Sequence, residues 1–365
     1  MAQLKDYVIV QPKSKIKASE GLNEGEYKFF TSSNTQTKWL NHFSYDKPAL
    51  IFGTGGMASV HYCDKPFSTS TDCIVMYSKG DFNLEYVYRY LESHMYILEN
   101  GFKGVGLKHI SKEYILSISI PEVDPYQQES LVVSARKIDE IICARQNQLT
   151  RVNELIKSRF VEMFGDPIQN EKGWGRKPLI NICKSIVDCP HSTPSYTFDD
   201  TGYMCIRTSI VKKNRILWEE IEYIPKDEYF KRIQRKKPER GDIIYTREGA
   251  ILGIAAIIDR ECNVALGQRM MLLSPDLDKC SPYFLSVAMN CDTFLDNALK
   301  GLSGSASPHI NVGDIKMFEM ILPPIELQNQ FATFVEQTDK LKFEAENSLE
   351  KLKTMKNAIM QQCFG

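Results

Sequence analysis

The chain has 365 residues, and its 45 lysines and arginines nearly balance 46 aspartates and glutamates, which gives a formal net charge of -1. This length predicts two or three domains, and a hydrophobic content of 43% with 25% charged residues excludes wholesale disorder. No apolar run reaches the roughly 18 residues of a membrane span, and the start of the sequence does not resemble a signal peptide. The ten cysteines include no CxxC pair, so we expect a cytoplasmic protein with reduced thiols, no zinc ribbon and no membrane contact.

Residues 1–124 are predicted to form a mixed α/β globule. Short β-rich runs such as Ala49–Phe52 and Cys73–Tyr77 lie between turns rich in glycine, proline, serine and aspartate. An amphipathic helix is expected at about 83–98. The segment therefore has the size and pattern of one domain.

Residues 125–165 are predicted to form one long helix. Apolar residues step by three and four over more than four heptads, with only Arg145 and Arg159 interrupting the stripe. Proline suits the start of this helix and glycine its end. The predicted stripe consists of Leu131, Ala135, Ile138, Ile142, Leu149, Val152, Ile156 and Met163.

Residues 166–324 repeat the pattern of the first globule, and residues 325–365 repeat the helix. Gly104–Gly165 can be laid over Gly304–Gly365 at a constant offset of 200 residues, with His-Ile, prolines and a closing Phe-Gly in the same order. The second stripe is predicted at Phe331, Val335, Leu341, Ala345, Leu349, Leu352, Met355 and Ile359.

These elements predict an α+β protein in which two mixed α/β globules are separated by two long helices. An apolar stripe has to be buried, and the equal lengths and positions of the helices favour their mutual packing as an antiparallel coiled coil in a pseudo-twofold repeat. The flanking charges Arg145, Arg159, Lys342 and Lys356 are either borders of the stripe or surfaces for partners.

No pattern assembles an active site. The sequence contains no GxxxxGK[ST] string, and Leu322–Ile325 lacks the polar acceptor and the aromatic residue that an amino-methyltransferase needs. Gly53–Gly56 follows an apolar run and leaves one alternative open, an enzyme that depends on a nucleotide or S-adenosylmethionine. A tight turn is the simpler interpretation, so we expect no catalytic, metal or cofactor-binding residue in this chain.

Binding chemistry is better represented than catalytic chemistry. Residues 205–250 carry 12 basic and 8 acidic side chains, a local excess of +4, and Lys231–Lys237 alone holds five positive charges. Lysine and arginine bind DNA phosphates, whereas arginine, glutamine, serine and threonine at loop tips match the hydrogen-bonding edges of bases. The candidate DNA-binding residues of the first globule are Thr31, Ser32, Ser33, Thr54, Ser59, His61, Ser68 and Ser70. Those of the second globule are His191, Thr193, Arg207, Lys212, Lys213, Arg235, Lys236, Lys237, Thr246, Arg247, Gln268 and Arg269.

The ordered motifs resemble the specificity (S) subunit of type I restriction–modification systems over essentially the whole chain. In the second globule, Asp188–Tyr196 is similar to the family's D-x-x-H-x-T-P-like stretch, and it is followed by Gly202–Arg207, Arg240–Thr246 and Leu266–Arg269. In the first globule, Gly25–Ser33, Gly53–Tyr62 and Phe67–Asp72 look like another subclass of the same target recognition domain. Pro323–Gln328 is similar to the entry into the family's helical regions, from which Pro121–Pro125 departs.

The resemblance implies a non-catalytic, sequence-specific DNA-binding subunit. Two target recognition domains, 1–124 and 166–324, would each read half of a bipartite asymmetric target, and the spacer helices 125–165 and 325–365 would set the gap. The implied partners are double-stranded DNA, two methyltransferase subunits and restriction subunits. S-adenosylmethionine, ATP and Mg²⁺ would belong to those partners and not to this chain.

Overall fold

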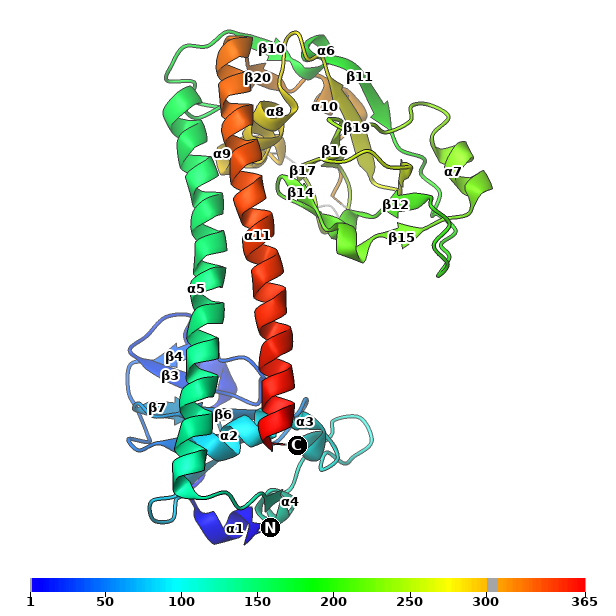
Figure 1. The fold of residues 1–365 in the computed structure, drawn as a ribbon. Coiled ribbons are helices and arrows are strands. Elements are labelled where there is room, and N and C mark those ends of the chain that lie inside the picture. Colours follow the sequence, from blue (N-terminus) through cyan, green and yellow to red (C-terminus); the bar gives the residue numbers. More distant parts are fainter. Residues whose placement is uncertain (1, 301–307, 365) are drawn as a thin grey trace. The chain divides into compact units, whose positions relative to one another are not determined.

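The computed structural model describes residues 2–300 and 308–364, with the side chains of residues 361–364 left aside (Figure 1). It divides into unit 1, Met1–Asn147 with Ala345–Gly365, and unit 2, Gln148–Glu344. Each unit therefore contains one globule and a part of each long helix. Residues 301–307 and the closing Gly365 of the second repeat lie outside the described residues. Within the described residues, no helix is both long enough and apolar enough to cross a membrane.

Unit 1 contains one antiparallel sheet, of order β2-β8-β5-β6, and one mixed sheet, of order β4-β3-β7, in which β3 and β7 are parallel. β1 pairs with β9. The strands are β1 (Ala2–Gln3), β2 (Val8–Val10), β3 (Tyr27–Phe30), β4 (Lys38–Leu40), β5 (Ala49–Gly53), β6 (Ser59–Cys63), β7 (Phe67–Thr69), β8 (Cys73–Ser78) and β9 (Ser119–Ile120). The helices of the globule are α1 (Leu4–Tyr7), η1 (Ala18–Glu20), α2 (Leu84–Ser93), α3 (Met95–Glu99) and α4 (Lys112–Ser117).

Unit 2 repeats the strand pairings of unit 1 and adds one hairpin. Its antiparallel sheet has the order β11-β19-β16-β17, its mixed sheet has the order β15-β12-β18 with β12 and β18 parallel, and β10 pairs with β20. The strands are β10 (Arg176–Pro178), β11 (Cys183–Asp188), β12 (Met204–Ile206), β13 (Val211–Lys212), β14 (Arg215–Ile216), β15 (Glu222–Tyr223), β16 (Ile243–Thr246), β17 (Ala255–Ile257), β18 (Val264–Leu266), β19 (Met270–Pro275) and β20 (Glu319–Ile321). The helices of the globule are α6 (Leu179–Ile182), η2 (Thr208–Ile210), η3 (Trp218–Glu220), α7 (Lys226–Arg232), α8 (Pro282–Met289), α9 (Asp292–Ala298) and α10 (Val312–Lys316).

The predicted repeat is thus confirmed in element order and strand pairing, and unit 2 differs mainly by an insertion between β12 and β16. The insertion contributes the β13–β14 hairpin and α7. Asn214, at the hairpin turn, has φ of 63° and accepts a hydrogen bond from Asn290 Nδ2 at 2.7 Å. This bond fixes the insertion to α8 at the edge of the sheet.

Two helices, α5 (Pro125–Phe164) and α11 (Ile325–Phe364), have 40 residues each. In unit 2 they pack against each other through Phe160 and Phe331, whose ring centroids are 5.5 Å apart. In unit 1, Lys356 of α11 lies 2.8 Å from Asp139 of α5. Contacts between a late residue of one helix and an early residue of the other confirm the predicted antiparallel packing.

The stripe of α11 differs from the prediction at two positions. Leu341 and Met355 were expected to be buried, but they are 60% and 56% exposed. The residues that face inward follow a regular spacing of four and three, which is the seam pattern of a coiled coil. They are Phe331, Val335, Thr338, Lys342, Ala345, Leu349, Leu352 and Lys356. The period was hidden because threonine and lysine occupy three seam positions.

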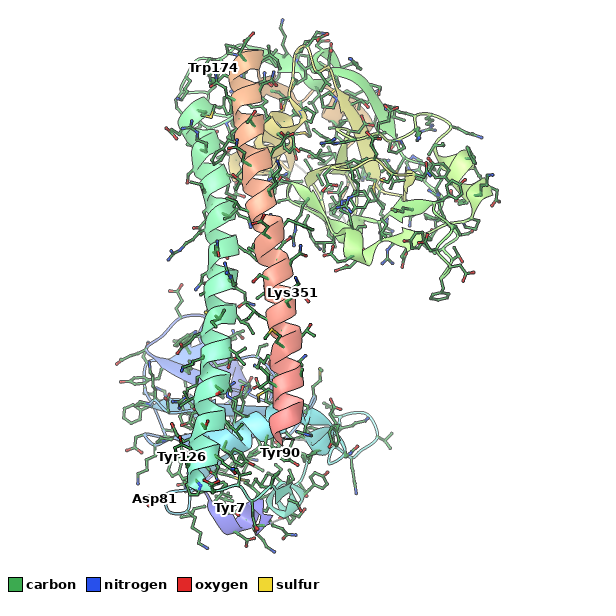
Figure 2. The ribbon with its side chains drawn as sticks, in the orientation of Figure 1. Tyr7, Asp81, Tyr90, Tyr126, Trp174 and Lys351 are labelled. Carbon is green, nitrogen blue, oxygen red and sulfur yellow. The ribbon has the colours of Figure 1, made fainter. Side chains whose placement is uncertain are left out.

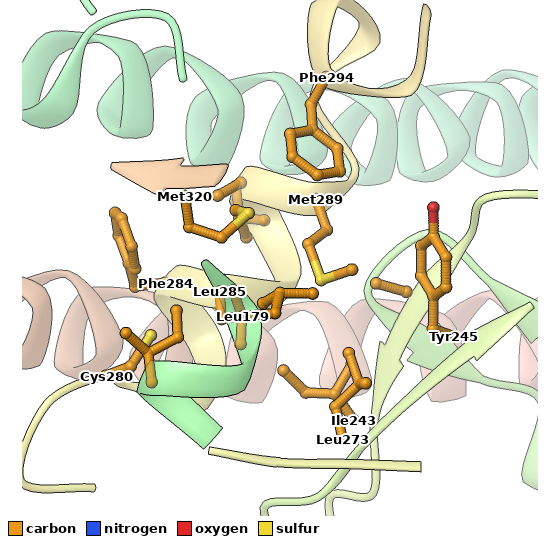
Figure 3. Close-up of a cluster of buried hydrophobic side chains, with 14 of the residues drawn as sticks. Leu179, Ile243, Tyr245, Leu273, Cys280, Phe284, Leu285, Met289, Phe294 and Met320 are labelled. Carbon is orange, nitrogen blue, oxygen red and sulfur yellow. The ribbon is translucent and has the colours of Figure 1, made fainter. Parts of the chain in front are cut away.

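The core of unit 2 joins its sheet to the helix pair (Figure 3). Phe160, Phe164, Phe284 and Phe331 form an aromatic cluster with ring centroids 4.9 to 5.6 Å apart, and all four are fully buried. Trp174, labelled in Figure 2, donates a hydrogen bond from Nε1 to the carbonyl of Phe164 at 2.9 Å. The C-terminal end of α5 is therefore fixed both by apolar packing and by a hydrogen bond to the backbone carbonyl of its last residue.

Candidate nucleic-acid interface

In unit 2, several candidate residues gather where the β16–β17 and β18–β19 turns meet the segment after β11. The amide of Arg247 donates to the carbonyl of Arg269 at 3.0 Å, which joins the two turns. Thr193 Oγ1 lies 3.5 Å from Gln268 Oε1, which brings the third segment alongside. Thr193 and Arg269 are exposed and Gln268 is partly exposed. These side chains can therefore meet a ligand at one surface.

Arg247 lies beneath this surface, contrary to the prediction that it is presented there. Its side chain is only 7% exposed, and Nε donates to Asp188 Oδ1 at 3.1 Å. Glu248 Oε1 lies 3.0 Å from Arg247 Nη2, and the exposed His191 places Nε2 3.0 Å from Asp188 Oδ2. Arg247 therefore neutralises two carboxylates and, through Asp188, orients His191. Thr246 was also expected at the surface but is fully buried, because its hydroxyl accepts from the amide of Ile254 at 2.9 Å.

The basic run Lys231–Lys237 is only partly a charged surface. Arg232 is 5% exposed and donates to the carbonyls of Ser192 and Leu266 at 2.7 and 3.2 Å, so it holds the loop after β11 against β18. Lys236 lies 3.1 Å from both Asp242 and Glu239. Burial lowers the pKa of Lys236, but its hydrogen bonds to Asp242 and Glu239 outweigh this effect and raise the pKa overall.

The other cations of unit 2 are more accessible. Lys212, Lys213, Arg235 and Lys237 are exposed. Lys213 pairs with Asp292 at 2.7 Å, and Arg235 Nη1 donates to the carbonyl of Asp188 at 3.1 Å. Arg207 lies 3.0 Å from Glu222, with its guanidinium 5.7 Å from the centre of the Tyr196 ring. Lys237 and Arg235 are therefore better placed for a phosphate than Lys236, which has two acidic neighbours.

In unit 1, the hydroxyl of Ser32 organises the corresponding tip. It donates to the carbonyl of Asp72 at 2.6 Å and accepts from the amide of Thr54 at 3.2 Å. Gly53 is required at this point, because an added Cβ would lie 2.9 Å from Ser32 Cα. Thr31, Ser32, Ser33 and Thr54 are all partly exposed, so this tip also presents polar groups.

Three predicted contacts of unit 1 are buried hydroxyls. Ser59 is 2% exposed, and Ser68 and Ser70 are not exposed at all. Ser68 Oγ donates to the carbonyl of His42 at 3.1 Å, which identifies it as an internal hydrogen-bonding group. Phe67 and Thr69, on either side of Ser68, are equally buried, so this part of the chain is enclosed on both faces, and the three serines do not belong to the proposed contact surface.

His61 is half-buried, and its Nε2 lies 2.8 Å from the carbonyl of Ser33. Burial lowers the pKa of the imidazole, and the hydrogen bond to Ser33 only partly offsets this. The neutral imidazole can donate this bond. His61 therefore supports the segment that carries Ser33 and is not itself at the tip.

The same backbone pairings recur in both units. The amide of Thr54 donates to the carbonyl of Asp72 at 2.9 Å, as the amide of Arg247 does to that of Arg269. Gly55 and Glu248 form isolated bridges with His109 and His309, respectively. Thr54 is thus equivalent to Arg247, and Asp72 to Arg269. Asp72 was not among the residues predicted to bind DNA. The equivalent pairs are 193 and 197 positions apart, not 200, and only pairing along the strands reveals them.

The Gly53–Gly56 segment is not a nucleotide-binding loop. It is the turn of an antiparallel hairpin, in which Gly53 of β5 pairs with Ser59 of β6. A dinucleotide-binding loop leads instead from a strand into a helix whose N-terminus faces the phosphates. The alternative of an enzyme that uses this loop has no support. Among the described residues, no group of three or more His, Cys, Asp or Glu side chains could hold a metal ion.

Comparisons with known proteins agree with the duplicated architecture. The type I restriction modification DNA specificity domain matches residues 1–160 and 171–354. The specificity subunit of the type I restriction enzyme MjaVIII from Methanocaldococcus jannaschii is 22% identical over 289 residues, which cover 75% of this chain and 68% of that protein. The EcoBI specificity subunit from Escherichia coli is 20% identical over 361 residues, which cover 88% of this chain and 74% of that protein.

Solved structures share the fold. The S subunit of a type I restriction–modification system from M. genitalium superposes with a TM-score of 0.64 at 13% identity, over 100% of this chain and 95% of that chain. A chain from a study of complex assembly in a type I system gives a TM-score of 0.53 at 16% identity, over 100% of this chain and 96% of that chain. With the family's domain matched twice in tandem over most of its length, the chain belongs to the type I restriction–modification DNA specificity family and is a specificity subunit.

Proposed function

We propose that each unit of this specificity subunit reads one half of a bipartite DNA target and that the two halves differ in sequence. The observation that carries the proposal is the repeated topology with unlike side chains at equivalent positions. Where unit 1 has Thr54 and Asp72, unit 2 has Arg247 and Arg269. Two surfaces with different hydrogen-bonding groups select different bases, so the target is asymmetric.

The phosphate contacts and the base contacts are proposed to come from different residues. Lys237, Arg235 and Lys212 are exposed cations of unit 2 and supply affinity that does not depend on sequence. Thr193, Gln268 and Arg269 in unit 2, with Thr31, Ser32, Ser33 and Thr54 in unit 1, supply groups that can reach base edges. Arg247 and Arg232 hold these segments in place from beneath.

The chain is proposed to direct other subunits and to be non-catalytic itself. Helices α5 and α11 are continuous over 40 residues each, which suits them to set the gap between half-sites and to bind two methyltransferase subunits. The relatives are named as specificity subunits of restriction enzymes, which supports methyltransferase and restriction subunits as partners. S-adenosylmethionine, ATP and Mg²⁺ are then used by those partners, in the cytoplasm.

Long-read mapping of modified adenines, in cells that carry the complete native system, tests this function. We expect one motif made of two unlike half-sites separated by a fixed gap. Deleting the chain should abolish all modification at this motif. A continuous palindrome, or modification that persists without the chain, would contradict the proposal.

A further inference from the structure

The two units carry opposite charges at the same turn. Asp72 lies in the turn from β7 to β8, and Arg269 lies in the turn from β18 to β19. The preceding strands are held alike. The amide of Ser70 donates to the carbonyl of Phe30, and the amide of Gly267 donates to the carbonyl of Ile206, both at 2.8 Å. With the bonds from Thr54 and Arg247 already described, the strand ends on both sides of the turn are paired alike in the two units, whereas within the turn Arg269 has a positive φ and Asp72 does not.

Both side chains at this turn are exposed and available. Among the residues that the structure describes, neither the Asp72 carboxylate nor the Arg269 guanidinium has a hydrogen-bonding or ionic partner, whereas Arg247 and Arg207 nearby are both paired with acids. Arg269 also has φ of 70°, a conformation that is unfavourable for a residue with a side chain. Such strain persists where the surrounding structure imposes it, and it is concentrated at functional sites.

The Arg269 side chain lies against Gly249. Gly249, in the turn after β16, has φ of 88°, and a Cβ placed there would be 3.5 Å from Arg269 Nη1. The guanidinium therefore lies against the turn after β16, and Gln268, the residue before Arg269, has its Oε1 3.5 Å from Thr193 Oγ1. This places a charged, planar donor next to two further base-reading candidates.

We propose that Asp72 and Arg269 are equivalent specificity-determining residues that read opposite members of a G·C pair. Arg269 would donate two hydrogen bonds to O6 and N7 of guanine, and Asp72 would accept one from the N4 amine of cytosine. An exposed carboxylate at a DNA-facing turn is repelled by phosphates, so it is favourable there only where a base amine is its partner. The inference rests on the proposed function and assigns one base position in each half-site.

The test is a binding selection from random duplex DNA, using the full chain with its native partner subunits. Arg269→Gln should reduce the preference for guanine at one position of one half-site, by roughly 10- to 100-fold, and leave the other half-site unchanged. Asp72→Asn should do the same for cytosine at one position of the other half-site. Controls come from the opposite ends of the same strands, where Asp64 precedes β7 and Arg260 precedes β18. Asp64→Asn and Arg260→Gln remove the same charges from exposed residues and should leave both half-sites intact.

The outcomes separate this inference from the proposed function. If the unaltered protein selects no bipartite motif, the proposed function fails. If it selects one but Arg269→Gln weakens binding to all sequences alike, Arg269 contacts a phosphate and the assignment is overturned. If Asp72→Asn strengthens binding to all sequences alike, the carboxylate lies beside phosphates and its assignment is overturned too.

Discussion

The ammonium group of Lys356 on α11 lies 2.8 Å from a carboxylate oxygen of Asp139 on α5, at a seam position that a coiled coil usually fills with an apolar residue. In unit 2, Lys342 of α11 likewise donates to Asn153 Oδ1 of α5 at 2.9 Å. Lys342 and Lys356 are therefore seam residues and not only the exposed partner surface that the sequence left open. The Lys356–Asp139 pair disfavours other registers, because a shifted helix would partly bury one of these charges without its partner.

Replacing Arg89 should destabilise unit 1. Arg89 is only 8% exposed and lies 2.5 Å from Asp139, 3.2 Å from Glu85 and 3.2 Å from Glu92. Arg89→Met leaves these carboxylates without their central cation, so we expect a loss of about 3 kcal/mol in the free energy of unfolding. Arg159→Met is the matched control on α5, because the Arg159–Glu162 pair is largely exposed and should contribute less than about 1 kcal/mol. Urea denaturation measures both, and equal losses in the two variants would show that burial does not govern the network.

Truncating Phe331 should destabilise unit 2 strongly. Its ring contacts those of Phe160 and Phe164, each at a centroid distance of 5.5 Å, and it is fully buried. Phe331→Ala should cost about 3 to 5 kcal/mol through lost burial and the cavity that remains. Phe343, on the same helix, is 64% exposed, and Phe343→Ala should change stability by less than about 0.5 kcal/mol. Thermal and urea unfolding of both variants distinguish them, and a small effect at Phe331 would contradict the packing of α11 on α5.

His61 should make unit 1 less stable in mild acid. Burial lowers the pKa of His61 below its ordinary value of 6.5. As the pH falls below that value, the unfolded chain takes up a proton that the folded chain resists, so the free energy of unfolding falls. His61→Gln should reduce this loss when unfolding is compared at about pH 7.5 and about pH 5.5, which bracket the ordinary histidine pKa. His42→Gln, at an exposed position, is the matched control and should change the free energy of unfolding by less than about 0.5 kcal/mol. A wild-type-like pH dependence in His61→Gln would reject the assignment.

Two neighbouring lysines should respond differently to the same substitution. Lys237 is exposed, so Lys237→Gln should weaken binding to every DNA sequence alike and reduce the salt dependence by the equivalent of about one phosphate contact. Lys236 pairs with Asp242, whose side chain is 7% exposed, so Lys236→Gln should instead lower stability by about 1 to 3 kcal/mol. Binding titrations over a range of salt concentrations, together with urea unfolding, separate the two. If Lys237→Gln leaves the salt slope unchanged, Lys237 makes no phosphate contact.

The duplication and the long helices could be predicted from the sequence because both leave local signals. The period of three and four along 125–165 and 325–365 reports one buried face of a helix without any knowledge of its partner. Ordered turn and strand motifs likewise indicated the two α/β globules and the resemblance to specificity subunits. A seam that includes Thr338, Lys342 and Lys356 could not be predicted in this way, because polar residues break the apolar period. Lys342 and Lys356 have partners on α5, whereas the hydroxyl of Thr338 donates to the carbonyl of Phe334 on its own helix.

The contact surface was decided by the tertiary structure. Ser59, Ser68, Ser70, Thr246 and Arg247 have the same side-chain chemistry as exposed base-reading residues, and composition cannot show which way a strand residue faces. Arg247 is drawn inward by Asp188, which is 59 positions away in the chain, and Asp72 and Arg269 become equivalent only through backbone pairings between distant strands. Local periodicity fixes elements, whereas burial and charge pairing depend on residues that are close only after folding.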